Sequence, residues 1–267
     1  MVKSFVSYCF GDYGVPPARA PFSMHATLLT HFSNGAFYPV GGASEIAYHV
    51  IPTIEAAGGR VLVRANVSEI LTSSSGNVVG VRVRRGKGQP DVDISAPLVI
   101  SNAGMKNTFN KLLPASVLAK STVANLLPRL KTGLACFQLF VGLRGSADEL
   151  GVKPQNHWCF TRPDLDQLLD EYLALSATEA AEADIPLMFV SFPSAKDPTW
   201  SRRFPPAADG TPKTTCAIVT LVNWDWFRRH DVGEEAVVRG RDNDDYEELK
   251  TALQERLWEQ VWLRVNG

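Results

Sequence analysis

Residues 38–64 read YPVGGASEIAYHVIPTIEAAGGRVLVR and hold the local signals that decide the fold. Apolar residues recur every four positions between 44 and 57, which predicts a helix with one apolar face. Gly58 and Gly59 can end this helix in the left-handed conformation that glycine adopts at little cost. The next five residues, 60–64, alternate in side-chain character and predict a short strand directly after the helix.

The following thirty residues predict an antiparallel meander of three short strands. A first apolar run begins at Val67 and ends at the polar turn 73–77. Residues 78–84 then place valines on one face of a returning strand, and residues 91–94 suggest a third strand. Strand, turn and strand in this order are typical of a β-hairpin.

A different kind of strand is predicted at residues 98–100, where every position is apolar. Such a run is typical of a strand that is buried on both faces. It stops at Ser101, Asn102, Ala103 and Gly104, which are small or polar. In open α/β sheets, ligands bind outside the carboxyl ends of the strands, and small residues let the backbone approach a ligand closely. We therefore expect a binding site at this corner.

The rest of the chain alternates between helical and strand patterns. Helices are predicted at 106–127 with a break at Pro114, and at 165–175, 174–183 and 244–265; strands are predicted at 132–143, 158–160, 187–192 and 215–223. Residues 194–213 contain four prolines and predict a long loop. This mixture places the chain in the α/β class, with an α+β arrangement of its strands.

Composition excludes several classes of function. The chain has 27 basic and 28 acidic residues, which argues against nucleic-acid binding because phosphate contacts need a basic excess. The four cysteines form no C-x-x-C pair, and we expect no metal site. There is no apolar run long enough for a transmembrane helix.

The order of these elements resembles the phytoene desaturase and carotenoid isomerase family of flavoproteins. The resemblance begins with the helix after Tyr-Pro-x-Gly-Gly and continues through the hairpin at Val67 to the Val-Ile-Ser-Asn-Ala-Gly stretch at 99–104. Five stretches in the same order resemble a retinol-reducing branch of that family: Gly11–Gly14, Tyr38–Ala47, Val141–Gly145, Pro193–Trp200 and Asp245–Lys250. Together they extend over nearly the whole chain.

The resemblance implies a fold in two parts and a redox activity. A partial FAD-binding, Rossmann-like domain is expected at 38–112, and a mixed-sheet substrate domain is expected from 1–37 together with 113–267. The implied cofactor is FAD, with NAD or NADP as a candidate electron source. The implied partner is a polyene lipid, either retinol or a carotenoid. We also expect peripheral association with the endoplasmic reticulum or another internal membrane.

Some residue roles follow from the resemblance alone. Val67, at the start of the hairpin, is expected to bind the adenine through its backbone. The corner formed by Ser101, Asn102, Ala103 and Gly104 is expected to face the dinucleotide. Gly41 and Gly42 precede a helix N-terminus, which favours negative charge on a flavin or substrate. No catalytic residue is assigned. The candidate proton donors are His25, His31, His49 and Tyr38.

The chain departs from the family pattern in two places. It contains no Gly-x-Gly-x-x-Gly turn to hold a pyrophosphate, and the C-terminal flavin motif is also missing. We therefore expect an incomplete copy with uncovered sheet edges and poor solubility. Three functions stay open: a polyene reductase, a carotenoid cis-trans isomerase or desaturase, and a non-catalytic fragment that is unable to bind FAD alone.

Overall fold

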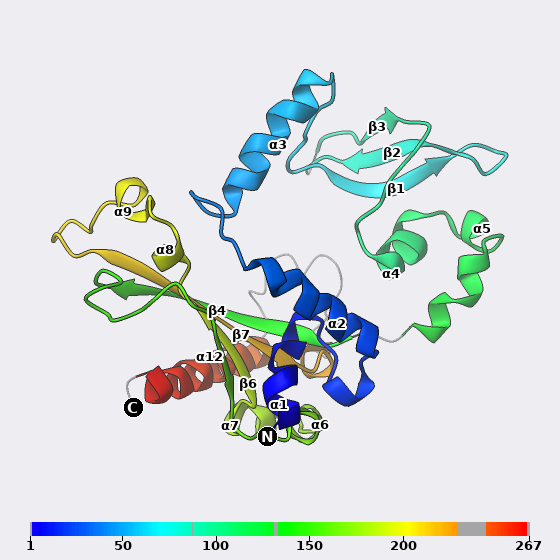
Figure 1. The fold of residues 1–267 in the computed structure, drawn as a ribbon. Coiled ribbons are helices and arrows are strands. Elements are labelled where there is room, and N and C mark those ends of the chain that lie inside the picture. The colour runs from blue at the N-terminus through cyan, green and yellow to red at the C-terminus, as the bar shows by residue number, and fades with distance from the viewer. Residues whose placement is uncertain (1, 87, 131–132, 229–243, 266–267) are drawn as a thin grey trace. The chain divides into compact units, whose positions relative to one another are not determined.

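The computed structural model describes residues 2–86, 88–130, 133–228 and 244–265. The chain forms two compact units, one of Met1–Tyr48 with Gly133–Gly267 and the other of His49–Thr132. From the sequence, the partial FAD-binding domain was expected at 38–112. Figure 1 shows the course of the chain.

The first unit is built on a four-stranded antiparallel sheet with the strand order β4-β7-β6-β5. Its strands are β4 (Ala135–Arg144), β5 (His157–Phe160), β6 (Leu187–Ser191) and β7 (Lys213–Val222). β4 and β7 pair along their full lengths, from Ala135 opposite Val222 to Arg144 opposite Lys213. All four strands were predicted from the sequence, with boundaries that differ by a few residues.

One face of this sheet is closed by the C-terminal helix α12 (Asp244–Val265), which runs along it in Figure 1. Leu253, Leu257 and Val261 recur every four residues on the helix and are buried. Leu257 and Val261 belong to the same core cluster as Ile218 of β7. The apolar stripe that these three residues form on the helix is therefore the face that seals the main core.

The other face of the sheet is partly covered by the N-terminal segment. Phe10, in the turn η1 (Tyr8–Asp12), packs in a second core with Leu187, Leu221 and helix α6 (Leu165–Leu173). A Cβ atom on Gly11 would lie 2.5 Å from the Trp158 ring, so only glycine lets this turn approach the sheet so closely.

Short helices complete the first unit. They are α1 (Val2–Ser7), η2 (Pro17–Arg19), α2 (Phe22–His31), η3 (Phe32–Asn34), α7 (Ala177–Glu182), α8 (Pro193–Lys196), α9 (Trp200–Arg203) and α10 (Asp225–Arg228). Two of them, α8 and α9, lie in the stretch 194–213 that the sequence predicted as a loop.

The second unit contains the predicted meander. Strands β1 (Asn66–Thr72), β2 (Val78–Arg84) and β3 (Val92–Ser95) pair antiparallel in this order. Helix α3 (Ser44–Ala56) precedes them and begins in the first unit. The helical stretch predicted at 106–127, with a break at Pro114, is divided further into short helical segments: α4 (Met105–Asn107), η4 (Thr108–Leu112), α5 (Ala115–Leu118), η5 (Thr122–Asn125) and η6 (Leu127–Arg129).

Two predicted strands are wrong. Residues 60–64 and 98–100 have no strand structure, and the predicted burial of 98–100 is also wrong. Val63, Leu98 and Ile100 are 82%, 73% and 89% exposed. A strand needs a neighbour to satisfy its N–H and C=O groups, and no described strand pairs with either segment. Apolar composition alone did not create these strands.

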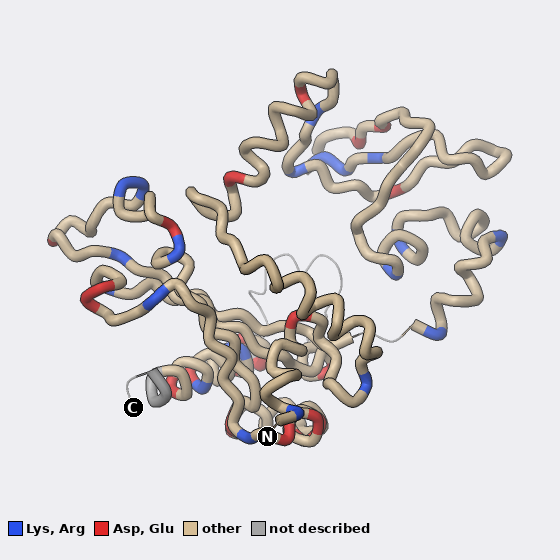
Figure 2. The backbone as a smooth tube through the Cα atoms, in the orientation of Figure 1, with Lys and Arg blue, Asp and Glu red and all other residues tan. Residues whose placement is uncertain are grey.

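The fold class expected from the sequence, mixed α/β, is confirmed. Lys and Arg residues are scattered among Asp and Glu in both units (Figure 2). No described helix is both long enough and apolar enough to cross a bilayer. Within the described ranges, no group of three His, Cys, Asp or Glu residues could hold a metal ion.

The closed face of the sheet gives a stability prediction. We expect Leu257→Ala to lower the free energy of unfolding by about 2–5 kcal/mol, because Leu257 is fully buried and truncation leaves a cavity. Phe22→Ala, on an exposed side chain of α2, should change it by no more than about 0.5 kcal/mol. Urea unfolding of both variants tests this, and equal losses would contradict the assigned core.

Candidate functional site

The Gly41–Gly42 turn has a backbone shape that favours glycine at both positions. The φ angles of Gly41 and Gly42 are 95° and 92°, in the left-handed region that other residues rarely adopt. A Cβ atom on Gly41 would also lie 2.6 Å from Cγ of Glu45, in the first turn of α3. Local geometry therefore explains the glycine pair without a ligand.

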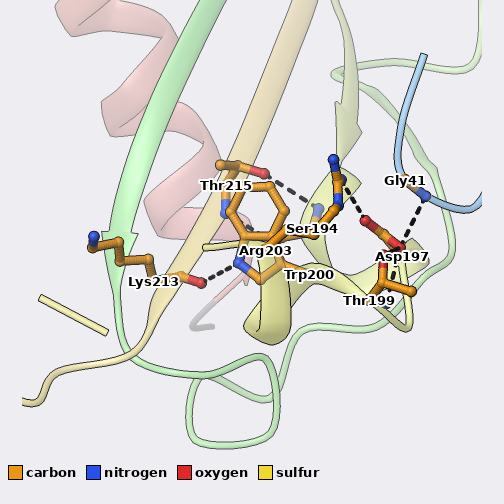
Figure 3. Close-up of polar contacts among 8 residues, drawn as sticks. All are labelled: Gly41, Ser194, Asp197, Thr199, Trp200, Arg203, Lys213 and Thr215. Atoms are coloured by element: carbon orange, nitrogen blue, oxygen red, sulfur yellow. Dashed lines mark hydrogen bonds and ion pairs between the residues drawn. The ribbon is translucent and has the colours of Figure 1, made fainter. Parts of the chain in front are cut away.

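A buried carboxylate anchors this turn to the sheet of the first unit. The Asp197 side chain is 1% exposed and accepts a hydrogen bond from the Gly41 N–H at 3.2 Å. It also accepts from the Thr199 N–H at 2.9 Å and the Thr199 hydroxyl at 2.7 Å. Arg203 forms an ion pair with its other oxygen at 2.7 Å. Figure 3 shows these groups converging on one carboxylate.

These partners determine the charge state of Asp197. Burial acts to raise the pKa of its carboxyl group, but the hydrogen bonds from Thr199, Arg203 and Gly41 outweigh burial. The pKa consequently lies well below its usual range, and the group stays ionised at neutral pH. A carboxylate that accepts several hydrogen bonds is a rigid structural anchor rather than a proton donor.

The segment that carries Asp197 is itself fixed to β7. The Ser194 N–H donates to the Thr215 hydroxyl at 3.2 Å, and the Thr215 N–H donates to the Ser194 hydroxyl at 2.9 Å. The Trp200 indole N–H donates to the Lys213 carbonyl at 2.7 Å. As Figure 3 shows, α8 and α9 are thus held on the strand from both sides of Asp197.

Lys196, the neighbour of Asp197, points to a different set of partners. Its ammonium group donates to the Ser191 hydroxyl at 2.5 Å and to the Asn156 side-chain carbonyl. It lies 5.9 Å from the centre of the Tyr38 ring. A Cβ atom built on Gly42 would lie 3.6 Å from the Tyr38 hydroxyl oxygen, so Tyr38 lies near both Lys196 and the glycine turn.

The candidate proton donors lie in different places. His25 Nε2 is 3.1 Å from the Val6 carbonyl oxygen and Nδ1 is 3.1 Å from the Tyr13 hydroxyl. Since a carbonyl can only accept, we assign the proton of a neutral His25 to Nε2 and let Nδ1 accept from Tyr13. His31 is exposed against Phe32. Among the four candidates, the structure places Tyr38 beside Gly42.

His49 and the remaining predicted binding residues lie in the second unit. Ser101, Asn102, Ala103 and Gly104 are exposed, and the Ser101 hydroxyl hydrogen-bonds that of Thr108 at 2.7 Å. Residues 108–112 lie against β1, the strand that contains the half-buried Val67. Gly104 has a φ angle of 86°, with open space where a Cβ atom would be. Residues 108–112 thus contact both β1 and, through Thr108, the corner at Ser101.

The sequence alone gave no role to Asp197, Lys196 or Arg203. Asp197 lies in the stretch Pro193–Trp200, which contributed to the family resemblance. Its hydrogen-bond partner Gly41, however, lies 156 residues earlier in the chain. Two features of the sequence could have suggested the contact: a pair of adjacent glycines and an isolated Asp-Pro within a motif. Neither feature identifies its partner.

The anchor gives a prediction on stability and pH. We expect Asp197→Asn to lower the free energy of unfolding by about 1–3 kcal/mol at pH 7, because Arg203 loses its buried counter-charge. Since the folded pKa is lowered, the stabilisation is complete above the unfolded pKa of about 3.9 and is lost as pH falls through the folded value.

Urea unfolding at pH 7 and at pH 3 measures this difference. Asp209→Asn is the control, because Asp209 also pairs with an arginine but is exposed to solvent. The wild-type advantage over Asp197→Asn should shrink at the lower pH. An advantage that is unchanged or larger at pH 3 would contradict an ionised anchor.

Comparisons with known proteins identify relatives by sequence. No protein-family model and no solved structure matches the chain. The all-trans-retinol 13,14-reductase of Danio rerio is 42% identical over 249 residues, which cover 93% of this chain and 39% of that protein. The protein of the same name from Homo sapiens is 39% identical over 254 residues, 95% of this chain and 40% of that protein.

A third relative, from Danio rerio, is named inactive all-trans-retinol 13,14-reductase. It is 40% identical over 233 residues, 87% of this chain and 37% of its own length. More distant similarity, 25% over 70% of this chain and 30% of the relative, links it to phytoene desaturase of Neurospora crassa. Prolycopene isomerase 1 of an Oncidium hybrid matches at 40% over 39% of this chain and 17% of its own length.

The chain spans about two fifths of the length of the curated reductases that it matches. The match to the protein from Homo sapiens covers 254 of the 267 residues, a share that leaves room for the glycine turn, the meander and the Asp197 segment within it. More distant similarity extends to phytoene desaturase and prolycopene isomerase. By its sequence, this chain belongs to the family of the all-trans-retinol 13,14-reductases.

Proposed function

We propose that this chain acts in the FAD-dependent reduction of a polyene lipid, with all-trans-retinol as substrate and its 13,14 double bond as the bond reduced. The support is the similarity of about 40% to proteins named for this reaction, extending over more than nine tenths of the chain. Those relatives are more than twice as long as this chain. We therefore propose their activity for this chain rather than assign it.

The second unit offers residues that fit part of a flavin dinucleotide. The corner Ser101–Gly104 is exposed, and Gly104 leaves its backbone open to close approach by a ligand. We propose that this corner and the backbone of Val67 hold the dinucleotide. A bound, reduced flavin supplies a hydride to one carbon of the double bond. The assignment of Gly41 and Gly42 to the same cofactor stays a prediction.

In the first unit, the chain's own residues provide position and polarity. Asp197 fixes the glycine turn through the Gly41 N–H, which keeps Tyr38 beside Gly42 and near Lys196. A rigid turn keeps its neighbours in one geometry, as a binding site requires. The Tyr38 hydroxyl and the Lys196 ammonium are the two groups at this turn that can donate a proton to an alkene carbon.

Flavin binding can be tested with two matched glycine variants. Gly104 and Gly76 have φ angles of 86° and 85°, and a Cβ atom added to either residue would have no other atom within 4 Å. We expect Gly104→Val and Gly76→Val each to cost about 1–2 kcal/mol in stability through the left-handed backbone. Only Gly104→Val should weaken FAD binding, by about tenfold, because its side chain fills the proposed contact.

The measurement is titration of the chain with FAD, followed by flavin fluorescence and visible absorbance. Gly76 lies in the turn between β1 and β2, so it controls for backbone strain. Equal loss of affinity in both variants would contradict the proposed contact at Gly104. A chain that binds no FAD at any concentration would sink the proposal that its own residues hold the cofactor.

A second candidate is a family member without catalytic activity. The observation that favours it is the relative named inactive, whose identity of 40% is close to those of the reductases. Anaerobic incubation of the FAD-loaded chain with a reductant and all-trans-retinol separates the two candidates. A dihydroretinol product supports reduction, and bound flavin without product supports the inactive alternative.

Three other predictions that come from the family can also be tested. The prolycopene isomerase relative supports a cis-trans isomerase as an alternative, which converts one geometric isomer without adding hydrogen. NAD or NADP as electron source is tested by replacing the reductant with each nucleotide. Association with the endoplasmic reticulum or another internal membrane is tested by flotation of the chain with lipid vesicles.

A further inference from the structure

Lys196 keeps a half-buried positive charge among neutral partners. Its two hydrogen-bond acceptors, Ser191 and Asn156, carry no charge, and no carboxylate forms an ion pair with it among the described residues. Burial lowers the pKa of its ammonium group. Withdrawing an ammonium from water without a counter-ion costs free energy, and such groups are concentrated at binding and catalytic sites.

Beside Lys196, the second face of the sheet presents an apolar surface. On β6, Ser191 lies two residues after Phe189, so both side chains lie on this face. In register, Phe189 is opposite Val219 and Ser191 is opposite Ala217. The next strand places Phe140 opposite Ala217, and the Phe189 ring lies 4.9 Å from that of Trp158. We name this surface the apolar strip: Phe140, Trp158, Phe189, Ala217 and Val219.

The apolar strip is only partly covered. Phe140 is 73% exposed, and the other members are half-buried. The opposite face of the same sheet is closed by α12, so the two faces differ in burial. The strip ends at the Ser191 hydroxyl and the Lys196 ammonium. One end of the surface is thus polar. The exposed Gln138, opposite Val219, adds a polar side chain at the edge of the same face.

We propose that Lys196 binds the terminal oxygen of a polyene alcohol whose apolar chain lies along the apolar strip. This inference rests on the proposed function and names a specificity-determining residue for it. Lysine can only donate hydrogen bonds, so it selects an acceptor such as a hydroxyl oxygen. A hydrogen bond from a charged donor is stronger than a neutral one, and the apolar strip accounts for the rest of the ligand.

The test compares all-trans-retinol with the matching hydrocarbon polyene that lacks the hydroxyl group. Dissociation constants for the chain are measured by ligand fluorescence, for the wild type and for Lys196→Met. We expect the ratio of the two constants, hydrocarbon to alcohol, to fall roughly tenfold in Lys196→Met. Lys196→Arg keeps the charge and should retain part of the preference for the alcohol.

Lys153→Met is the matched control. Lys153 is exposed and lines a cavity of about 440 Å³ with His157 and Val190, whose side chains face the opposite side of the sheet. Its removal should leave the ratio unchanged. Thermal unfolding shows whether each variant is folded. If Lys196→Met does not fold, Lys196→Leu takes its place, and the same fall in the ratio is expected because leucine also has no hydrogen-bond donor.

The outcomes separate this inference from the proposed function. If the wild type prefers the alcohol and both Lys196→Met and Lys196→Leu keep that preference, the role of Lys196 is overturned while polyene binding stands. If the wild type binds neither ligand, the polyene ligand is wrong, and the proposed function falls with the inference. If Lys153→Met changes the ratio as much as Lys196→Met, the effect comes from the loss of any positive charge on the chain, and the inference fails.

Discussion

The hydrogen bonds to the Asp197 carboxylate are the constraint on which the candidate site depends. A buried, ionised carboxylate is tolerated only when its oxygens are well bonded, and here Thr199, Arg203 and the Gly41 N–H supply those bonds. The same contacts fix a turn that is 156 residues away in the chain. One side chain therefore determines where the glycine pair lies and, with it, where Tyr38 lies.

The sheet of the first unit divides structural and functional roles between its two faces. α12 closes one face with residues such as Leu257, and this burial supplies stability. The other face is covered only in part, by the segment around Phe10, and it leads to Lys196. An apolar surface that stays partly exposed does not contribute the full free energy of burial to folding. Such surfaces are common at binding sites.

Family membership and activity are separate questions for this chain. Relatives named as reductases and one named as inactive are all about 40% identical to it. A fold can persist while the chemistry of its site changes, because packing depends on many residues and reaction on few. For this reason the tests above measure flavin and polyene binding by individual residues, apart from turnover.

The sequence by itself determined the features that depend on neighbouring residues: α3, the β1–β2 hairpin, the strands of the larger sheet and the apolar stripe of α12. It also determined the family. Tertiary structure decided the features that need a distant partner. Residues 60–64 and 98–100 had a strand pattern but no strand to pair with, and they stayed exposed. The contact of Asp197 with Gly41 and the position of Lys196 beside Tyr38 depend on how the chain returns on itself, which local periodicity does not encode.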